Sequence, residues 1–274
     1  MTGKGTPPPA PALSAERLRI ARTGSEAGQR RIAEETAIAF TYGRATYAVM
    51  MATPKDVEDF AVGFSLTERI IDRAEDIAEL DIMQLPLGIE LRMTLSGNHD
   101  SALQARRRNM AGPAGCGLCG IESLEAAMHK PATVSSGLRI PPETVFRAMH
   151  ELHARQPLNA ETHAVHAAGF WSPSGNGFTA VREDVGRHNA LDKLAGALAR
   201  AGRDAQNGFI ALTSRVSIEL VQKAAAIGCP LIAAVSAPTG FAVRAAQDAG
   251  LTLIAIARDD SFEVFTHGER IAGP

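Results

Sequence analysis

The sequence predicts an α/β protein preceded by a smaller α+β unit. In the second half of the 274-residue chain, continuous apolar runs at residues 209–213, 230–235 and 251–257 alternate with amphipathic stretches. Strands that are apolar throughout are covered on both faces, and their alternation with helices is typical of sheets with parallel segments. In the first half, shorter runs surround one helical pattern, which indicates the α+β unit.

The N-terminal segment predicts a disordered tail. Residues 1–28 are rich in Pro, Gly, Ala and charged side chains and contain few large apolar ones. Such a composition buries too little apolar surface to offset the entropy of ordering. We therefore expect a tail over residues 1–28, an α+β domain over 29–110 and an α/β domain over 111–274.

The α+β domain is expected to begin with a β-hairpin. Residues 34–41 and 45–52 are rich in β-branched, aromatic and small apolar side chains around Gly43. Thr53 then has the character of a helix N-cap, with Pro54 at the first helical position and an apolar face following at helical spacing. Two further strands and a polar helix are expected at residues 77–85, 88–95 and 101–110.

The α/β domain is expected to carry a ligand site at one edge of its sheet. Strands are predicted at residues 164–171, 177–183, 209–213, 230–235, 251–257 and 262–266, and helices at 189–201, 217–227 and 238–249. Polar clusters follow three of these strands, at residues 183–189, 213–217 and 258–261. Ligands of such sheets bind at the carboxyl ends of the strands.

The α/β domain is expected to open with a segment that contains a Cys-x-x-Cys pair. Cys116 and Cys119 are flanked by glycines, which predicts a mobile loop, and three arginines at 106–108 would favour the reactive thiolate. The motif suits a sulfur carrier, a redox pair or half of a zinc site, and these alternatives stay open at this point. Cys229 enters an apolar strand and is expected to be a buried structural cysteine.

Composition narrows the class of protein. The net charge is −2, so no overall basic field indicates nucleic acid, and no apolar run approaches the ~18 residues of a spanning helix. The N-terminus lacks the apolar core of a signal peptide, and we expect a cytoplasmic protein without membrane attachment. Standard phosphate-binding glycine loops are absent from the sequence.

The cluster at residues 183–189 has two interpretations. It combines two acids, Arg187, His188 and Asn189 around one glycine at a strand-to-helix junction. A helix N-terminus offers free N–H groups to an anion, so a phosphate or a guanine edge could bind there. The alternative is a capped helix with a solvated polar turn. Considered by itself, His166 is more typical of a histidine with a structural role than of one that binds a ligand.

Taken together, the motifs resemble the FdhD/NarQ family of formate dehydrogenase accessory sulfurtransferases. They are Gly115-Cys116-Gly117-Leu118-Cys119-Gly120 after the arginines, His166-Ala167-Ala168, Glu183-Asp184-Val185-Gly186-Arg187-His188-Asn189-Ala190-Leu191-Asp192-Lys193, Val221-Gln222-Lys223 and Val235-Ser236-Ala237-Pro238-Thr239. The likeness runs in order from about Pro54 to Arg270. The chain departs from the common pattern at residues 162–166 and at Ser214, where glycine is usual.

The resemblance implies a function, partners and a fold. Such proteins take persulfide sulfur from a cysteine desulfurase and deliver it to the bis-molybdopterin guanine dinucleotide cofactor of formate dehydrogenase. It also implies a homodimer and a cytidine-deaminase-like C-terminal domain. We expect no metal of its own.

The resemblance also implies the site residues. The persulfide carrier maps onto Cys116, with Cys119 as its partner. The residues expected to bind the cofactor are Ile256, Ala257, Arg258, Asp259, Asp260, Ser261, His166, Asp184, Arg187 and His188.

Two other functions compete with sulfur transfer. A zinc deaminase needs His-x-Glu upstream of Pro-Cys-x-x-Cys, and here the only His-x-Glu is His267-Gly268-Glu269, downstream. A non-catalytic cofactor chaperone is the second alternative.

Overall fold

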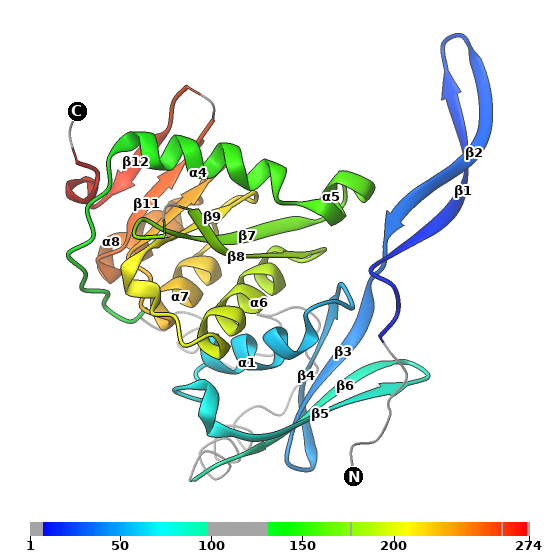
Figure 1. The fold of residues 1–274 in the computed structure, drawn as a ribbon, viewed down its shortest axis with the longest axis horizontal. Helices are drawn as coiled ribbons and strands as arrows, with labels where there is room; N and C mark the ends of the chain where they lie inside the picture. The colour runs from blue at the N-terminus through cyan, green and yellow to red at the C-terminus, as the bar shows by residue number, and fades with distance from the viewer. Residues whose placement is uncertain (1–7, 98–130, 176, 259, 273–274) are drawn as a thin grey trace.

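A computed structural model of the chain describes residues 8–97, 131–175, 177–258 and 260–272. The Cys-x-x-Cys pair, the three arginines and the predicted helix at 101–110 lie outside these ranges. The described chain has three parts: a long β-hairpin, a four-stranded sheet with one helix, and a six-stranded sheet with helices on both faces (Figure 1).

The hairpin consists of β1 (Ala12–Ala21) and β2 (Gly24–Ala33), and it projects away from the rest of the molecule (Figure 1). The expected disorder of residues 1–28 is therefore wrong for residues 12–28. Composition measures how much apolar surface a segment can bury, whereas this hairpin is built from backbone hydrogen bonds between its two strands. We call β1 and β2 together the arm.

The four-stranded sheet has the order β4-β3-β6-β5. Its strands are β3 (Thr36–Tyr42), β4 (Ala45–Ala52), β5 (Ile77–Leu85) and β6 (Gly88–Leu95). The predicted hairpin around Gly43 is confirmed, and Gly43 takes the positive φ of 61° that its turn requires. Helix α1 (Val57–Thr67) packs its aromatic side chains on one face of this sheet, beside a short 3-10 helix at Ala74–Asp76.

Helix α1 begins later than the sequence predicts. Its N-cap is Asp56, and Thr53 lies in the segment ahead of the helix. Thr53 is buried and bonds instead to the second half of the chain, as described below.

The six-stranded sheet has the order β12-β11-β10-β9-β7-β8. Its strands are β7 (His166–Ser172), β8 (Gly177–Asp184), β9 (Phe209–Leu212), β10 (Leu231–Ala234), β11 (Thr252–Ala255) and β12 (Glu263–Thr266). Strands β9, β10 and β11 are parallel, and the outer pairs are antiparallel. All six strands were predicted.

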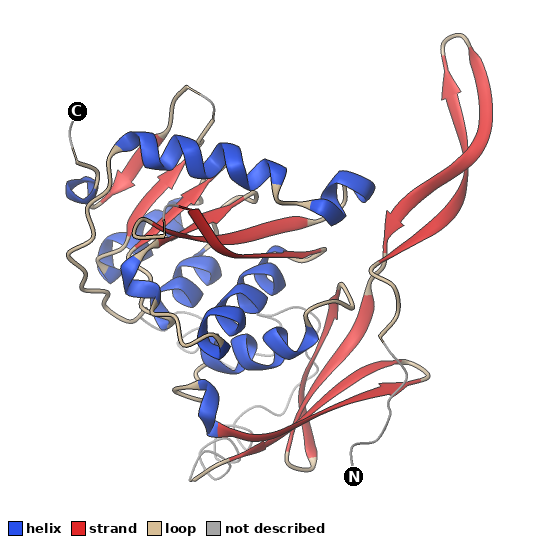
Figure 2. Ribbon diagram, in the orientation of Figure 1, coloured by secondary structure: helices blue, strands red, loops and turns tan. Residues whose placement is uncertain are grey.

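Helices cover both faces of this sheet (Figure 2). One face packs against α6 (Arg187–Arg200), α7 (Ile218–Ala226) and α8 (Gly240–Ala249), and the other against α4 (Pro142–Ala154), which α5 (Pro157–Thr162) follows. Short 3-10 helices lie at Ala205–Asn207 and Gly268–Arg270. Helices α4 and α5 were not predicted. The expected mixed α/β fold with a parallel segment is confirmed.

The two sheets are joined where α1 packs against α6. A Cβ atom added at Gly63 would lie 1.6 Å from the backbone oxygen of Asp192, and one added at Gly196 would lie 1.9 Å from that of Asp59. The two helices therefore touch through their backbones, and glycine is required at both positions of this crossing.

Two further observations concern Cys229 and membrane-spanning helices. Cys229 is fully buried, as expected, and burial raises the pKa of its thiol to about 12. Among the described residues, no helix is both long and apolar enough to cross a membrane.

Candidate functional site

The fold brings the three predicted polar clusters to one edge of the six-stranded sheet. Strands β8, β9, β10 and β11 all end at this edge, and β7 begins there, because β7 runs antiparallel to its neighbours β8 and β9. We call it the carboxyl edge. From β8 to β11 it spans four strand spacings of about 4.8 Å, roughly 19 Å in all.

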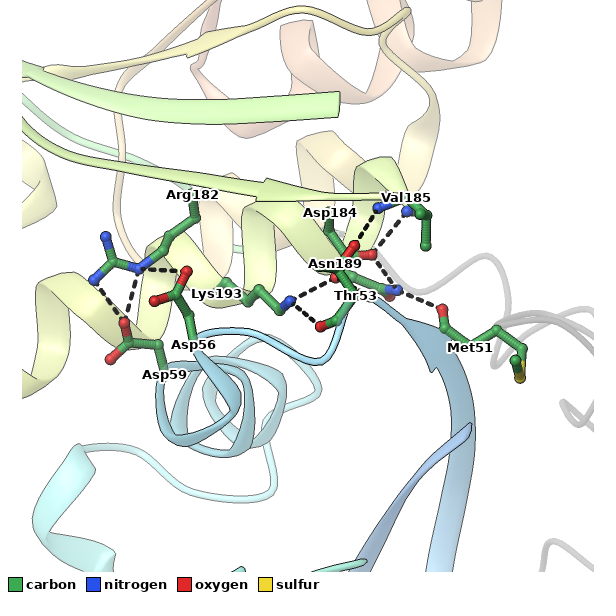
Figure 3. Close-up of polar contacts among 10 residues, drawn as sticks. Met51, Thr53, Asp56, Asp59, Arg182, Asp184, Val185, Asn189 and Lys193 are labelled. Carbon is green, nitrogen blue, oxygen red and sulfur yellow. Dashed lines mark hydrogen bonds and ion pairs between the residues drawn. The ribbon is translucent and has the colours of Figure 1, made fainter. Parts of the chain in front are cut away.

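The carboxylate of Asp184 organises the turn after β8 from inside the protein (Figure 3). Its Oδ1 accepts hydrogen bonds from the backbone N–H of Gly186 (2.8 Å) and from Nδ2 of Asn189 (3.0 Å). Its Oδ2 accepts from the backbone N–H of Thr53 (3.0 Å) and lies 2.6 Å from Nζ of Lys193. The side chains of Asp184 and Lys193 are both fully buried.

Both acids of this cluster therefore have internal partners. Glu183 is buried as well, and its carboxylate accepts from the backbone N–H groups of Leu158 (3.0 Å) and Asn159 (2.8 Å) at the start of α5. The sequence places Asp184 among the ligand contacts, whereas in the structure its oxygens hold the turn that carries Arg187 and His188.

Arg187 and His188 form the first turn of α6, whose N-cap, Gly186, provides no side-chain hydrogen bond. Nε of Arg187 is buried, and none of the described residues accepts a hydrogen bond from it. Nε2 of His188 lies 3.4 Å from Oγ of Ser217 and 3.8 Å from Oε2 of Glu219, both in the segment that follows β9. That Glu219 oxygen is also buried, and it accepts no hydrogen bond from the described residues.

His166 belongs to the same group. It is the first residue of β7, is half-buried and pairs in register with Asp184 of β8. Burial lowers its pKa, and the charge of Arg187 lowers it further. The structure therefore brings His166, Arg187 and His188 together around the ends of β7, β8 and β9.

Burial and arginine charge determine the electrostatics of this group. Burial lowers the pKa of His188 to about 4, and Arg187 contributes to the shift. Burial also lowers the pKa of Arg187, and the neighbouring positive charge of Arg215 adds to that effect. At neutral pH the histidines are therefore uncharged and the arginines supply the positive charge. A bound anion would relieve the repulsion between Arg187 and Arg215.

The predicted loop at residues 256–261 lies at the far end of the carboxyl edge. Ile256 has a φ of 51°, in the left-handed region that a β-branched residue rarely adopts. Ala257 is buried, and its N–H donates to the carbonyl of Ala234 (3.0 Å). Arg258, Asp260 and Ser261 are exposed, and Asp259 lies outside the described residues. Backbone strain of this kind is concentrated at ligand sites.

The two groups are separated by the ends of β9 and β10. The loops after these strands are tied together, since the N–H of Thr239 donates to the carbonyl of Val216 (2.9 Å). From His166 on β7 to the end of β11 is three strand spacings, about 14 Å. A ligand that touches both groups must therefore be extended.

Comparison with known proteins then assigns the chain to a family. The model of the FdhD/NarQ family matches residues 33–272. The chain belongs to this family. Two proteins named Sulfur carrier protein FdhD are similar over nearly their whole length. One, from Agrobacterium fabrum, is 50% identical over 265 residues, which are 94% of this chain and 97% of the relative. The other, from Brucella abortus, is 51% identical over 250 residues, 91% and 93% of the two chains.

A solved structure agrees with this assignment. The crystal structure of a protein from Desulfotalea psychrophila, described provisionally as a formate dehydrogenase accessory protein, superposes with a TM-score of 0.74 at 25% identity. The superposition covers 96% of this chain and the whole of the Desulfotalea psychrophila chain. The resemblance to the FdhD/NarQ family that the motifs indicate is thereby confirmed.

The His-x-Glu that a deaminase would use lies away from the carboxyl edge. His267 and Glu269 follow β12, and the pairing of Thr266 with Leu253 places the end of β12 beside the start of β11, at the opposite edge. Nε2 of His267 lies 2.9 Å from the carbonyl oxygen of Gln247. In the described parts of the chain, no group of three His, Cys, Asp or Glu side chains could hold a metal ion.

The sequence did not identify several residues of the site. Thr53 lies 131 residues from Asp184 in the chain, and only the fold brings the two together. Glu219 could have been found, because it lies in the first turn of a helix that directly follows a predicted strand and a polar cluster.

Proposed function

We propose that this FdhD/NarQ protein is a sulfur carrier for the maturation of formate dehydrogenase. It takes sulfur from a cysteine desulfurase as a persulfide and delivers it to the bis-molybdopterin guanine dinucleotide cofactor. The observation that carries the proposal is similarity over nearly the full length to proteins named sulfur carriers, and the Cys-x-x-Cys of this chain supports it. The accessory role is supported by the description of the similar solved structure.

The proposed chemistry uses both cysteines of the motif. The Cys116 thiolate attacks the outer sulfur of the donor's persulfide, and the donor's cysteine leaves as a thiolate. Attack of Cys119 on the inner sulfur of the Cys116 persulfide then releases hydrosulfide and leaves a Cys116–Cys119 disulfide. The two cysteines supply the two electrons of this step, and a thiol reductant must reduce the disulfide before the next cycle. These residues lie outside the described ranges.

The carboxyl edge is suited to the nucleotide part of the substrate. Arg187, with its free Nε and its like-charged neighbour Arg215, and the uncapped start of α6 suit a phosphate or pyrophosphate. The carboxylate of Glu219 suits the N–H edge of guanine. The roughly 14 to 19 Å between the two groups suits an extended dinucleotide better than a single nucleotide.

The proposal also covers the domains, the oligomeric state, the cellular location and the client of the protein. We assign residues 29–110 to a small α+β domain and residues 111–274 to a domain of cytidine-deaminase-like arrangement. We also propose that the protein is a homodimer, works in the cytoplasm and holds no metal of its own, and that its client is a formate dehydrogenase.

The second candidate is a cofactor chaperone that transfers no sulfur. It is favoured by one observation: the described part of the carboxyl edge offers groups suited to a bound nucleotide, Arg187 and Glu219. The two candidates differ in what removal of Cys116 does.

The test is maturation of formate dehydrogenase in cells that lack their own accessory protein. We expect Cys116→Ala to abolish dehydrogenase activity while the purified variant binds guanine nucleotide like the wild type. We expect Arg187→Ala to weaken nucleotide binding about tenfold or more while the variant still accepts a persulfide. Normal activation by Cys116→Ala would favour the chaperone.

A further inference from the structure

Strand β5 forms one outer edge of the four-stranded sheet. Among the described strands it pairs only with β6, so the backbone N–H and C=O groups along its other side have no strand beside them. The opposite edge strand, β4, differs, because the turn after β8 reaches its end and Nδ2 of Asn189 donates to the carbonyl of Met51 (2.9 Å). A free edge of this kind is a template for one more strand.

The outward face of β5 has two halves of different chemistry. Residues 79–85 pair regularly with β6, and alternation places Glu79, Asp81, Met83 and Leu85 on the face away from α1. All four are exposed, Met83 by 36% and Leu85 by 47%. Arg92, which lies opposite Asp81 on β6, is already paired with a glutamate of its own strand. One half of the face is therefore negatively charged and the other is apolar.

The inward face of β5 is incompletely covered. Leu80 and Ile82 pack against the core around Phe60 and Phe64 of α1, yet both remain half-buried, whereas Leu91 on the neighbouring strand is fully buried. The apolar layer between the sheet and α1 therefore extends to the edge of the sheet, and a further strand beside β5 would cover it.

A groove adjoins the apolar half of β5. It has a volume of about 350 Å³, and Leu85, Leu87, Met51 and Pro9 are among the residues that line it. Leu87 is 92% exposed and Met51 is 51% exposed. A groove with such a lining accommodates a large apolar side chain from a strand added at this end of β5.

The charges on β5 distinguish between occupants of the edge. Two copies of β5 paired antiparallel about Ile82 would place Glu79 opposite Leu85 and Asp81 opposite Met83, so the strand is not complementary to itself. Charged residues on a free edge prevent this kind of pairing between copies. A segment with basic side chains opposite the two acids and apolar ones opposite Met83 and Leu85 is complementary in both charge and polarity.

We propose that β5 binds an extended segment of a partner protein by strand addition. The segment runs antiparallel to β5, the commoner arrangement in sheets. Two apolar residues at alternate positions lie opposite Leu85 and Met83, and two basic residues, again at alternate positions, lie opposite Asp81 and Glu79. Backbone hydrogen bonds supply the affinity and the alternate side chains supply the specificity. This docking surface is independent of the carboxyl edge and of the sulfur chemistry.

The first test is fluorescence anisotropy of the full chain with a labelled probe peptide, Thr-Leu-Thr-Leu-Thr-Arg-Thr-Arg-Thr. We expect saturable binding to the wild type. Glu79→Lys combined with Asp81→Lys should weaken binding about tenfold or more, and a peptide with glutamates in place of the arginines should bind this variant in preference to the wild type. Glu143→Lys combined with Asp248→Lys is the control, because it changes the net charge equally at exposed acids of α4 and α8, and it should change the affinity by less than about twofold.

The second test separates strand addition from simple attraction between charges. N-methylation of alternate residues removes the N–H donors along one edge of the probe peptide, and only one edge of an added strand faces β5. Of two peptides methylated at the two alternate sets, we expect one to bind about tenfold more weakly or less and the other to bind like the unmethylated probe. Absence of saturable binding, equal affinities of the two methylated peptides, or equal affinities of the two double variants would overturn the proposal.

Discussion

His188 shows how burial sets the chemistry of a single residue at the carboxyl edge. Its pKa is about 4 in the folded protein, against an ordinary value of 6.5, first because it is buried and then because Arg187 is close. Its neutral ring can therefore meet Ser217 and Glu219 without adding to the charge of the arginines. Arg187 and Arg215 are therefore the charged groups of the carboxyl edge that favour an anion.

A depressed histidine pKa makes stability depend on pH. Between pH 6.5 and 4 the unfolded chain binds a proton at His188 that the folded chain does not, so the free energy of unfolding falls as the pH falls through this window. At pH 5 the loss is up to about 2 kcal/mol. We expect urea titrations at pH 7 and pH 5 to show this loss for the wild type and to show less of it for His188→Gln. Equal losses in the two proteins would contradict the assignment.

The residues of the site could be predicted only in part. Arg187 and His188 belong to a cluster that directly follows a predicted strand, so their place at the edge followed from the strand pattern, whereas His166 was expected at the site only from the family resemblance. The role of Asp184 was not accessible, because its partner Thr53 is 131 residues away. A carboxylate beside an arginine and a histidine resembles a ligand contact until the fold supplies its internal donors.

At the scale of elements, the ion pair of Asp184 and Lys193 ties β8 to α6 and to the segment before α1. Nζ of Lys193 also donates to the carbonyl of Thr53 (2.8 Å), so one ammonium group bonds to both halves of the chain (Figure 3). Burial alone would make such a pair costly, and the surrounding N–H donors offset that cost.

Removal of the ammonium group should therefore be strongly destabilising. We expect Lys193→Met to lower the free energy of unfolding by about 3–5 kcal/mol, because Asp184 is left as a buried charge without its cation. Addition of Asp184→Asn should recover part of this loss. Lys55→Met, at an exposed lysine, is the control and should change stability by less than about 0.5 kcal/mol. A loss as small as the control's would show that the pair is not structurally important.

Elements with a strong local signal were predicted well. The bounds of β5 and β6 agree with the expected strands, and Gly43 marks the turn between β3 and β4. The capping signal at Thr53 was misleading, because its backbone and hydroxyl groups bond to the turn after β8 instead. Helix α4 was overlooked although Val145, Ala148, Met149 and Leu152 have helical spacing and are buried. The arm was missed because residues 12–28 contain only three large apolar side chains, Leu13, Leu18 and Ile20.

At the scale of the whole molecule, the α1–α6 crossing holds the two sheets together. Its close approach depends on Gly63 and Gly196, which face backbone atoms of the opposite helix. An ion-pair group lies beside it, in which Asp59 accepts from Arg182 and Arg200. The crossing therefore fixes how the four-stranded sheet stands relative to the carboxyl edge.

A methyl group at this crossing should force the helices apart. We expect Gly63→Ala to lower the free energy of unfolding by about 2–3 kcal/mol, since the added Cβ would overlap the backbone of Asp192. Gly137→Ala is the matched control, because a Cβ there meets nothing within 4 Å. Equal stability of the two variants in urea titrations would show that the helices are not in backbone contact.

The central claim is that the protein carries sulfur as a persulfide on Cys116. The most direct measurement is intact-mass spectrometry after incubation with cysteine and an active cysteine desulfurase, for the wild type, Cys116→Ala and Cys119→Ala. The account predicts a gain of one sulfur atom in the wild type that a reductant removes, and no gain in Cys116→Ala. No gain in the wild type, with a donor shown to be active on another acceptor, would contradict sulfur transfer and favour the cofactor chaperone.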